Sequence, residues 1–163
     1  MNVVPIDING RIQQKNLKVT KSNVLINSRY DLTLTEFRLL KSCIAKINST
    51  EAIAPAKIKV YASEYQKTFD CANPYTELKE ASDRLFEREI SYYDEAIGKR
   101  VRVRWVQSVE YQDGEGSIAL EFTNMVKTHL IDLSHNFTSY QLRHISKFKS
   151  KYSIRFYELL YQH

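Results

Sequence analysis

Alternating arginines form the part of the sequence best suited to binding phosphate. Arg100, Arg102 and Arg104 occupy every second position between Lys99 and Trp105. Successive side chains of a β-strand point to opposite faces, so this spacing places three guanidinium groups on one face. A guanidinium holds phosphate through paired, charge-assisted hydrogen bonds. The same alternation is equally typical of a half-buried strand whose polar face is merely solvated, and the sequence leaves both interpretations open.

A second basic group lies near the end of the chain, around the predicted start of a final helix. Its members are Arg143, Lys147, Lys149, Lys151 and Arg155. Phosphate contacts by lysine and arginine supply most of the non-specific affinity of proteins for nucleic acid. Because the cations are denser here than along the alternating arginines, we favour a phosphate contact through Lys147, Lys149 and Lys151.

The helix predicted over residues 74–88 carries charges of both signs. Lys79 and Arg84 are candidates for DNA contact, provided that they share an exposed face with Thr76. Four carboxylates occupy the same helix: Glu77, Glu80, Asp83 and Glu87. Carboxylates repel a phosphate backbone. The helix is therefore predicted to read DNA sequence poorly, and the module to serve mainly protein association with accessory DNA contact.

An apolar face next to the arginines offers a different kind of site. Val103, Trp105, Val109 and Tyr111 face one way, opposite the arginines, if residues 100–111 form one strand. Aromatic side chains are enriched at subunit interfaces, so these four residues are candidates for a dimer interface. Packing into the core of the chain itself is the commoner fate of such a face.

The residues for enzyme chemistry are missing from the sequence. It holds no glycine-rich phosphate loop, no nucleophile elbow and no zinc-type spacing. A rolling-circle nuclease needs a tyrosine nucleophile and a metal held by closely spaced histidines. Eleven tyrosines are present, but no His-x-His pair, and Cys43 and Cys71 are predicted to be free thiols. We therefore predict no catalytic residue, no metal and no cofactor; the four separated histidines are His129, His135, His144 and His163.

Length and composition indicate one globular domain. The chain has 163 residues, of which 43% are hydrophobic and 26% charged. No apolar run approaches the roughly 18 residues of a membrane span, and the first residues lack the order of a signal peptide, so we expect a cytoplasmic protein. The net charge of +5 favours a polyanionic partner.

The order of predicted elements is that of a winged helix. Residues 1–18 have no sustained period and are predicted to be a flexible arm, with one domain over residues 19–163. Thr33 and Glu36 form a capping box at the start of a helix that runs to about Asn48. The remaining predictions are β-like residues 24–26, a strand at 57–60, helices at 63–69 and 74–88, strands at 90–93 and 100–111, a hairpin turn at 112–116 with a returning strand, and helices at 123–130, 140–147 and 151–162. The predicted fold class is thus α+β, with helices packed on a small antiparallel sheet, a β-hairpin wing and C-terminal helices.

The final helix is predicted to dock on an apolar surface. Ser150 is a plausible N-cap. Ile154, Tyr157 and Leu160 follow the three-residue spacing of one helix face, which we expect to be buried against this domain or against a further one. Arg155 and Glu158 are expected to make structural pairs.

Several stretches resemble the N-terminal winged-helix domain of plasmid replication initiators that bind iterons, the group that includes RepA, RepE and the π protein. The resemblance covers the chain from about residue 19 to its end. It is carried by Lys21-Ser22-Asn23-Val24-Leu25-Ile26, by Leu32-Thr33-Leu34-Thr35-Glu36-Phe37-Arg38-Leu39-Leu40, by Leu85-Phe86, and above all by Lys149-Ser150-Lys151-Tyr152-Ser153-Ile154-Arg155-Phe156-Tyr157-Glu158-Leu159-Leu160.

The resemblance implies a protein that binds repeated sequences at a plasmid origin as a monomer and represses its own gene as a dimer. It implies that this domain mediates dimerisation and auxiliary phosphate-backbone contacts to double-stranded DNA, while a second, C-terminal winged helix, absent from this chain, reads most bases. Host replication proteins and chaperones are further expected partners, and the chain is either a fragment or a short natural variant. The alternative function is a protein-interaction winged-helix module or transcriptional regulator without direct DNA contact.

Overall fold

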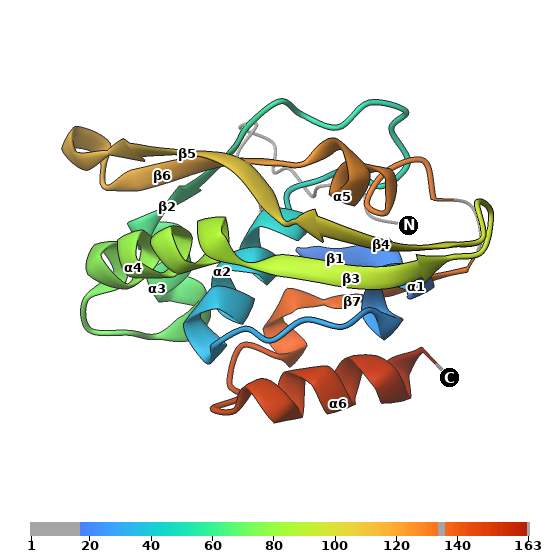
Figure 1. Ribbon diagram of the computed structural model, residues 1–163. Coiled ribbons are helices and arrows are strands. Elements are labelled where there is room, and N and C mark those ends of the chain that lie inside the picture. The colour runs from blue at the N-terminus through green and yellow to red at the C-terminus, as the bar shows by residue number, and fades with distance from the viewer. Residues whose placement is uncertain (1–16, 134–135, 163) are drawn as a thin grey trace.

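The structure, a computed structural model, describes residues 17–133 and 136–162 and combines helices with short strands (Figure 1). Its strands are β1 (Lys18–Ser22), β2 (Ile58–Tyr61), β3 (Glu89–Asp94), β4 (Lys99–Arg104), β5 (Val106–Gln112), β6 (Ser117–Phe122) and β7 (Phe137–Gln141). Its helices are α1 (Asn23–Asn27), α2 (Leu34–Ile44), α3 (Ala62–Phe69), α4 (Pro74–Glu87), α5 (Asn124–Thr128) and α6 (Lys151–Tyr161). No helix in these ranges is long and apolar enough to cross a membrane.

The strands form three small antiparallel sheets. β2, β6 and β5 make one sheet in that order, in which β5 and β6 are the hairpin wing; β3 pairs with β4, and β1 pairs with β7. The helix α6 lies on the side of the molecule away from the wing (Figure 1). The predicted α+β winged-helix architecture is therefore confirmed.

Local signals placed the central helices correctly. The Thr33 hydroxyl accepts a hydrogen bond from the backbone of Glu36, and the Glu36 carboxylate accepts one from the backbone of Thr33, so the predicted capping box starts α2. Pro74 occupies the first position of α4, as expected after Asn73. These helices pack together, and their apolar stripes enter one continuous core with Trp105.

Trp105 divides the long strand that we expected over residues 100–111. Its indole is fully buried and meets the ring of Tyr30 edge-on at 5.1 Å. Its backbone N–H donates to the carbonyl of Arg88, and its carbonyl accepts from Thr123. Because these bonds turn the chain, β4 and β5 belong to different sheets rather than to one strand.

Three other expectations are corrected by the structure. Residues 24–26 are helical rather than β-like, because Ser22 caps α1 by accepting a hydrogen bond from the Leu25 backbone at 3.2 Å. The helix expected over residues 140–147 is instead the end of β7 followed by a 3₁₀ turn at Leu142–His144, since β7 pairs with the distant β1. Of the expected arm, residues 1–16 lie outside the described residues, whereas Leu17 is buried and β1 begins at Lys18.

The last helix docks through a face that matches the expected one only in part. Ser150 caps α6, as predicted, by accepting from the Tyr152 backbone at 3.1 Å. Ile154 is fully buried and Tyr157 half-buried, but Leu160 is 60% exposed. Glu158 is fully buried instead, because Lys21 and Lys41 neutralise its carboxylate inside the domain. The spacing of apolar residues along the helix gave no indication that the Glu158 carboxylate would face inward.

Candidate nucleic-acid interface

The hairpin of β3 and β4 presents the alternating arginines on its outer face. Its register pairs Tyr93 with Arg100 and Ser91 with Arg102, and Arg104 follows two residues later. All three arginines are exposed, whereas Tyr92 on the opposite face is buried. The strand geometry predicted for the three guanidinium groups is therefore present.

These arginines differ in their freedom to bind a ligand. Arg102 forms an ion pair with Glu89 at 2.8 Å, and Arg104 donates to the carbonyl of Glu87 at 2.8 Å. Arg100 makes no side-chain hydrogen bond or ion pair to any described residue. Its guanidinium is consequently the one on this strand that is ready for an incoming anion without breaking a bond inside the protein.

Arg29 joins this surface through the tertiary fold. Its backbone exchanges two hydrogen bonds with Ser91 of β3, at 2.8 and 3.0 Å. Arg29 is exposed and, like Arg100, has no side-chain ion pair within the described ranges. The sequence offers no signal for this residue, because Arg29 stands alone in a polar segment and only the bridge to Ser91 shows where it lies.

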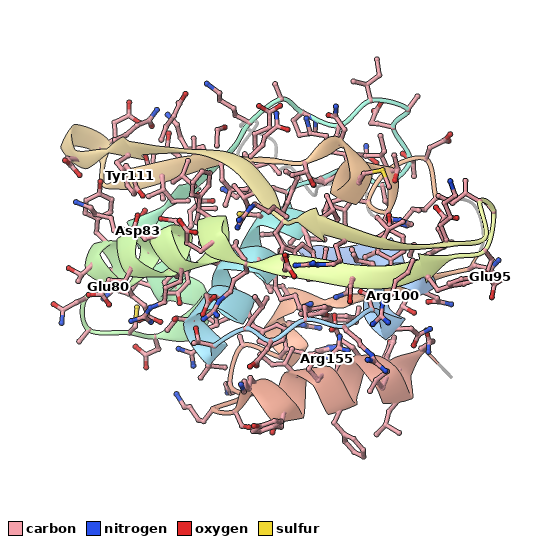
Figure 2. The ribbon with its side chains drawn as sticks, viewed as in Figure 1. Glu80, Asp83, Glu95, Arg100, Tyr111 and Arg155 are labelled. Atoms are coloured by element: carbon pink, nitrogen blue, oxygen red, sulfur yellow. The ribbon has the colours of Figure 1, made fainter. Side chains whose placement is uncertain are left out.

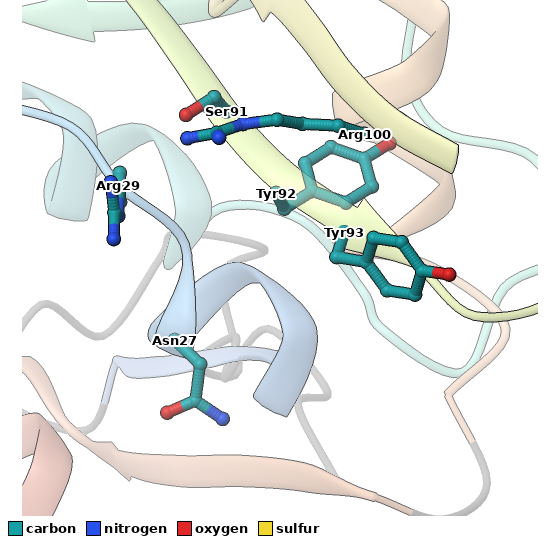
Figure 3. Close-up of a pocket in the computed structure, with 6 residues that line it drawn as sticks. All are labelled: Asn27, Arg29, Ser91, Tyr92, Tyr93 and Arg100. Carbon is teal, nitrogen blue, oxygen red and sulfur yellow. The ribbon is translucent and has the colours of Figure 1, made fainter. Parts of the chain in front are cut away.

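Arg29 and Arg100 line one hollow of about 260 Å³ at the edge of β3 (Figure 3). Asn27, Ser91, Tyr92 and Tyr93 complete its lining. The Tyr93 side chain is 61% exposed, whereas Tyr92 is buried. Burial raises the pKa of Tyr92 above its ordinary value, and Asp94 makes a smaller contribution in the same direction. Tyr92 is therefore neutral at pH 7, and the charge of the hollow comes from its two arginines.

Arg155 of α6 fixes the segment that carries Arg29. Its guanidinium donates to the carbonyls of Ile26 and Ser28, at 3.0 and 3.3 Å, and lies 4.4 Å from the centre of the Tyr30 ring. Arg155 thus has the structural role that was expected, with backbone and ring partners. In Figure 2 Arg100 and Arg155 lie on either side of this segment, which is bonded to β3 through Arg29 and to α6 through Arg155.

The second basic group is only partly available. Lys151 pairs with Asp31 at 2.6 Å, and this hydrogen bond lowers the pKa of the Asp31 carboxyl. Lys147 and Lys149 are exposed and have no ion pair within residues 17–133 and 136–162. Lys147 and Lys149 therefore remain candidates for phosphate contact, whereas Lys151 already has a counter-ion.

The two cations of α4 differ in their freedom to bind a ligand. Lys79 pairs with Asp113 at 3.4 Å, and Arg84 is exposed without an ion pair in the described part of the chain. Figure 2 shows Glu80 and Asp83 of this helix at the opposite end of the molecule from Arg100. Glu77 points inward and accepts a hydrogen bond from Tyr65 at 2.6 Å. Neither Lys79 nor Arg84 lines the hollow that holds Arg29 and Arg100.

The apolar residues considered for a dimer interface mostly belong to the core. Trp105 is 0% exposed, and Val103 and Val109 pack partly against the core cluster. Tyr111 is 44% exposed and donates a hydrogen bond to Asp83. The structure therefore removes Trp105 from the candidate interface, because a fully enclosed side chain has no surface to offer a partner.

The larger exposed apolar surface is on α6. Its members are the exposed apolar and aromatic side chains of the helix: Tyr152, Phe156, Leu159, Leu160 and Tyr161. We call these five residues the α6 stripe. Contiguous apolar patches on a protein surface commonly mark interaction sites.

Within the described residues, no group of three or more His, Cys, Asp or Glu side chains is arranged to hold a metal ion.

Comparisons with known proteins give consistent matches. The family described as "Initiator Replication protein, WH1" matches residues 18–161. A replication initiation protein of Escherichia coli is 28% identical over 149 residues, which cover 88% of this chain and 46% of that protein. An uncharacterized 27.6 kDa protein of Escherichia coli is 25% identical over 166 residues, covering 93% of this chain and 69% of the relative.

A solved structure supports the fold. The crystal structure of the Pi initiator protein in complex with iteron DNA superimposes with a TM-score of 0.76 at 21% sequence identity. The match covers 91% of this chain and 65% of that chain. This chain therefore spans about half to two thirds of the proteins to which it is similar.

Proposed function

We propose that this chain, which belongs to the Initiator Replication protein WH1 family, assists plasmid replication in two ways. It contacts the phosphate backbone of origin DNA, and it forms a dimer with a second copy of itself. The DNA is double-stranded and carries the origin repeats, and the setting is the cytoplasm of a bacterial host. The chain acts as a binding domain rather than as an enzyme.

One observation carries the DNA part of this proposal. Arg29 and Arg100 have no ion pair within the described ranges, and they stand on the same exposed face as Arg102 and Arg104. Phosphate contacts from such residues position a protein on a duplex without reading its sequence. Lys147 and Lys149, on the approach to α6, extend the same kind of contact.

This domain is poorly suited to reading the base sequence of DNA. A winged helix that reads sequence presents an exposed helix to the major groove. Here the exposed side of α4 carries Glu80, Asp83 and Glu87, which repel phosphate. We assign base reading to a further winged helix in longer proteins of this family, which is supported by the 46% share of the relative that this chain spans.

Association of two copies is supported by the α6 stripe. The stripe contains no charged residue, so it complements an identical surface without pairing of opposite charges. Apolar and aromatic side chains of this kind are typical of subunit interfaces. Host replication proteins and chaperones are further partners in the same proposal.

Titration of DNA with the chain at several salt concentrations tests the proposal. We expect binding to a duplex with origin repeats and to a random duplex of equal length, with similar affinities and a steep loss as salt rises. A several-hundred-fold preference for the repeats would contradict the backbone-only role. Absence of binding to both duplexes at low salt would favour a protein-interaction module without DNA contact.

A further inference from the structure

We propose that the hollow between α1 and the β3–β4 hairpin binds one unpaired nucleotide, with its phosphate on Arg29 and Arg100 and its base against the ring of Tyr93. The inference rests on the proposed DNA-binding function and adds the state of the DNA that this hollow accepts. The ligand chemistry is a phosphate joined to a base that has no pairing partner, supplied either by single-stranded DNA or by a free nucleotide.

The phosphate end of the hollow is defined by two guanidinium groups. Arg29 reaches it from the segment after α1, and Arg100 reaches it from β4 (Figure 3). Both lack an ion pair to a described residue, so binding an anion here breaks no existing interaction of these side chains. Two fork-shaped donors on one hollow match the oxygen atoms of a phosphate group better than two ammonium groups do.

The ring of Tyr93 supplies the surface for a base. Tyr93 lies directly opposite Arg100 in the strand register and is 61% exposed, more than Tyr111 of β5 at 44% or Tyr61 of β2 at 39%. Aromatic side chains beside a positively charged groove are the usual stacking platforms for single strands. Arg100 and the stacking surface are thus neighbours on one hairpin, and Arg29 lies on the segment bonded to Ser91 of the same hairpin.

A wider hollow of about 550 Å³ continues from the first one and shares Asn27, Tyr92 and Tyr93 with it. The buried Tyr92 hydroxyl has no hydrogen-bond partner among the described residues. Buried polar atoms nearly always have a hydrogen-bond partner, so the Tyr92 hydroxyl on this wall has a bonding capacity that no described residue uses. The two hollows together are larger than a single phosphate requires.

The shape and charge of the two hollows favour an unpaired base beside Tyr93, whereas Arg29 and Arg100 contact phosphate in single-stranded and duplex DNA alike. Bases in a duplex are stacked inside it, so an exposed tyrosine ring can stack only on a base that has left the helix. Asp94 and Glu95 line the wider hollow and repel phosphate. The sugar–phosphate chain is therefore directed towards Arg29 and away from the hairpin turn.

Fluorescence anisotropy with a labelled thymidine oligonucleotide and a duplex of equal length tests this inference. Tyr93→Ala should weaken single-strand binding by roughly 5- to 150-fold, the range of one base–aromatic stack, and leave duplex binding nearly unchanged. Tyr93→Phe should retain single-strand binding. Tyr61→Ala, which removes an exposed tyrosine from β2, is the matched control.

The phosphate end needs its own variant and control. Arg29→Ala with Arg100→Ala should weaken binding of the single strand more than Lys18→Ala with Lys67→Ala, which removes the same charge from exposed positions elsewhere. Displacement of the oligonucleotide by millimolar thymidine monophosphate would identify a free nucleotide as sufficient. Binding that requires the oligonucleotide would identify single-stranded DNA as the source.

The failures of the two proposals are distinguishable. Binding to the duplex without binding to the single strand overturns the nucleotide site and leaves the proposed function standing. An equal loss of single-strand and duplex binding in Tyr93→Ala also overturns it, because the residue would then not distinguish an unpaired base. Absence of binding to both forms overturns the nucleotide site together with the proposed DNA contact.

Discussion

Lys41 of α2 donates a hydrogen bond to Glu158 of α6 across 2.8 Å, and neither side chain is exposed to solvent. Lys21 of β1 lies at the same distance from the same carboxylate oxygen, and Tyr140 of β7 donates to that oxygen at 2.6 Å. Three parts of the chain therefore meet at one buried carboxylate. This cluster attaches α6, and with it Arg155, to the rest of the domain.

Replacing Glu158 by glutamine should destabilise the protein. Lys21 and Lys41 would then be buried neighbours of like charge without a counter-ion, and breaking a buried ion pair costs about 3–5 kcal/mol. Urea unfolding measures the free energy of unfolding of Glu158→Gln against the unchanged chain. Replacing Lys21, Lys41 and Glu158 together by apolar residues should recover much of the loss. A free energy of Glu158→Gln within about 0.5 kcal/mol of the unchanged chain would contradict this role.

The same cluster predicts a loss of stability in acid. Burial by itself raises the pKa of Glu158, but Lys21 and Lys41 outweigh burial and lower the pKa to about 2, from an ordinary value of 4.5. Between these values the unfolded chain binds a proton that the folded chain does not. Stability is therefore present above the unfolded pKa and falls as the pH drops from 4.5 towards 2.

Urea midpoints at a series of pH values check this acid prediction. We expect the free energy of unfolding to fall less steeply below pH 4.5 in Glu158→Gln than in the unchanged chain. Between pH 4.5 and pH 2 the two losses should differ by about 3 kcal/mol. Exposed carboxylates such as Asp31 contribute equally to both proteins, so they cancel in the comparison. Parallel pH profiles would show that Glu158 does not titrate in this way.

The two sides of α6 should respond differently to truncation. Ile154→Ala removes a fully buried side chain and should cost about 2–5 kcal/mol, whereas Leu160→Ala changes an exposed one and should stay within about 0.5 kcal/mol. Thermal and urea unfolding measure both. A larger loss for Leu160→Ala than for Ile154→Ala would mean that Leu160, and not Ile154, is buried where the helix docks.

Single substitutions should show that Arg100, which has no partner among the described residues, contributes more to duplex binding than Arg104, which is already hydrogen-bonded. Arg100→Ala should lower duplex affinity and reduce the slope of log K against log salt by about 0.9, the value for one phosphate contact. Arg104→Ala should have a smaller effect on binding, because the Arg104 guanidinium already donates to Glu87. The comparison uses one duplex over a range of salt, with Lys67→Ala as a control. An unchanged slope for Arg100→Ala would remove this residue from the interface.

The α6 stripe makes a prediction about oligomeric state. Phe156→Glu with Leu159→Glu would place charges in a dimer contact, so it should shift the protein towards the monomer. Sedimentation equilibrium over a range of concentrations measures this shift. Ile53→Glu, at a side chain that is 83% exposed on a distant loop, is the control. A dimer that survives the double change would place the interface on another surface.

Short-range signals were sufficient for much of the fold. The capping box of Thr33 and Glu36, and the proline that opens α4, act within one helical turn, so their effect is visible in the sequence. The exposed side of β4 also followed from its alternation. The capping serine at Ser22 is equally local, but the β-branched and apolar residues after it favoured a strand, and α1 was missed.

The amino-acid sequence by itself determined where most helices and strands begin, that the chain folds as a winged helix, and that arginines share one strand face. Only the tertiary structure decided which side chains are free to bind: it set Arg29 beside Arg100, engaged Lys151 with Asp31, enclosed Trp105 and turned Glu158 inward. Periodicity reports which face of an element is apolar, but it carries no information about which distant element that face meets. Pairings such as β1 with β7 and Arg29 with Ser91 join residues far apart in the chain, and these pairings place the charges.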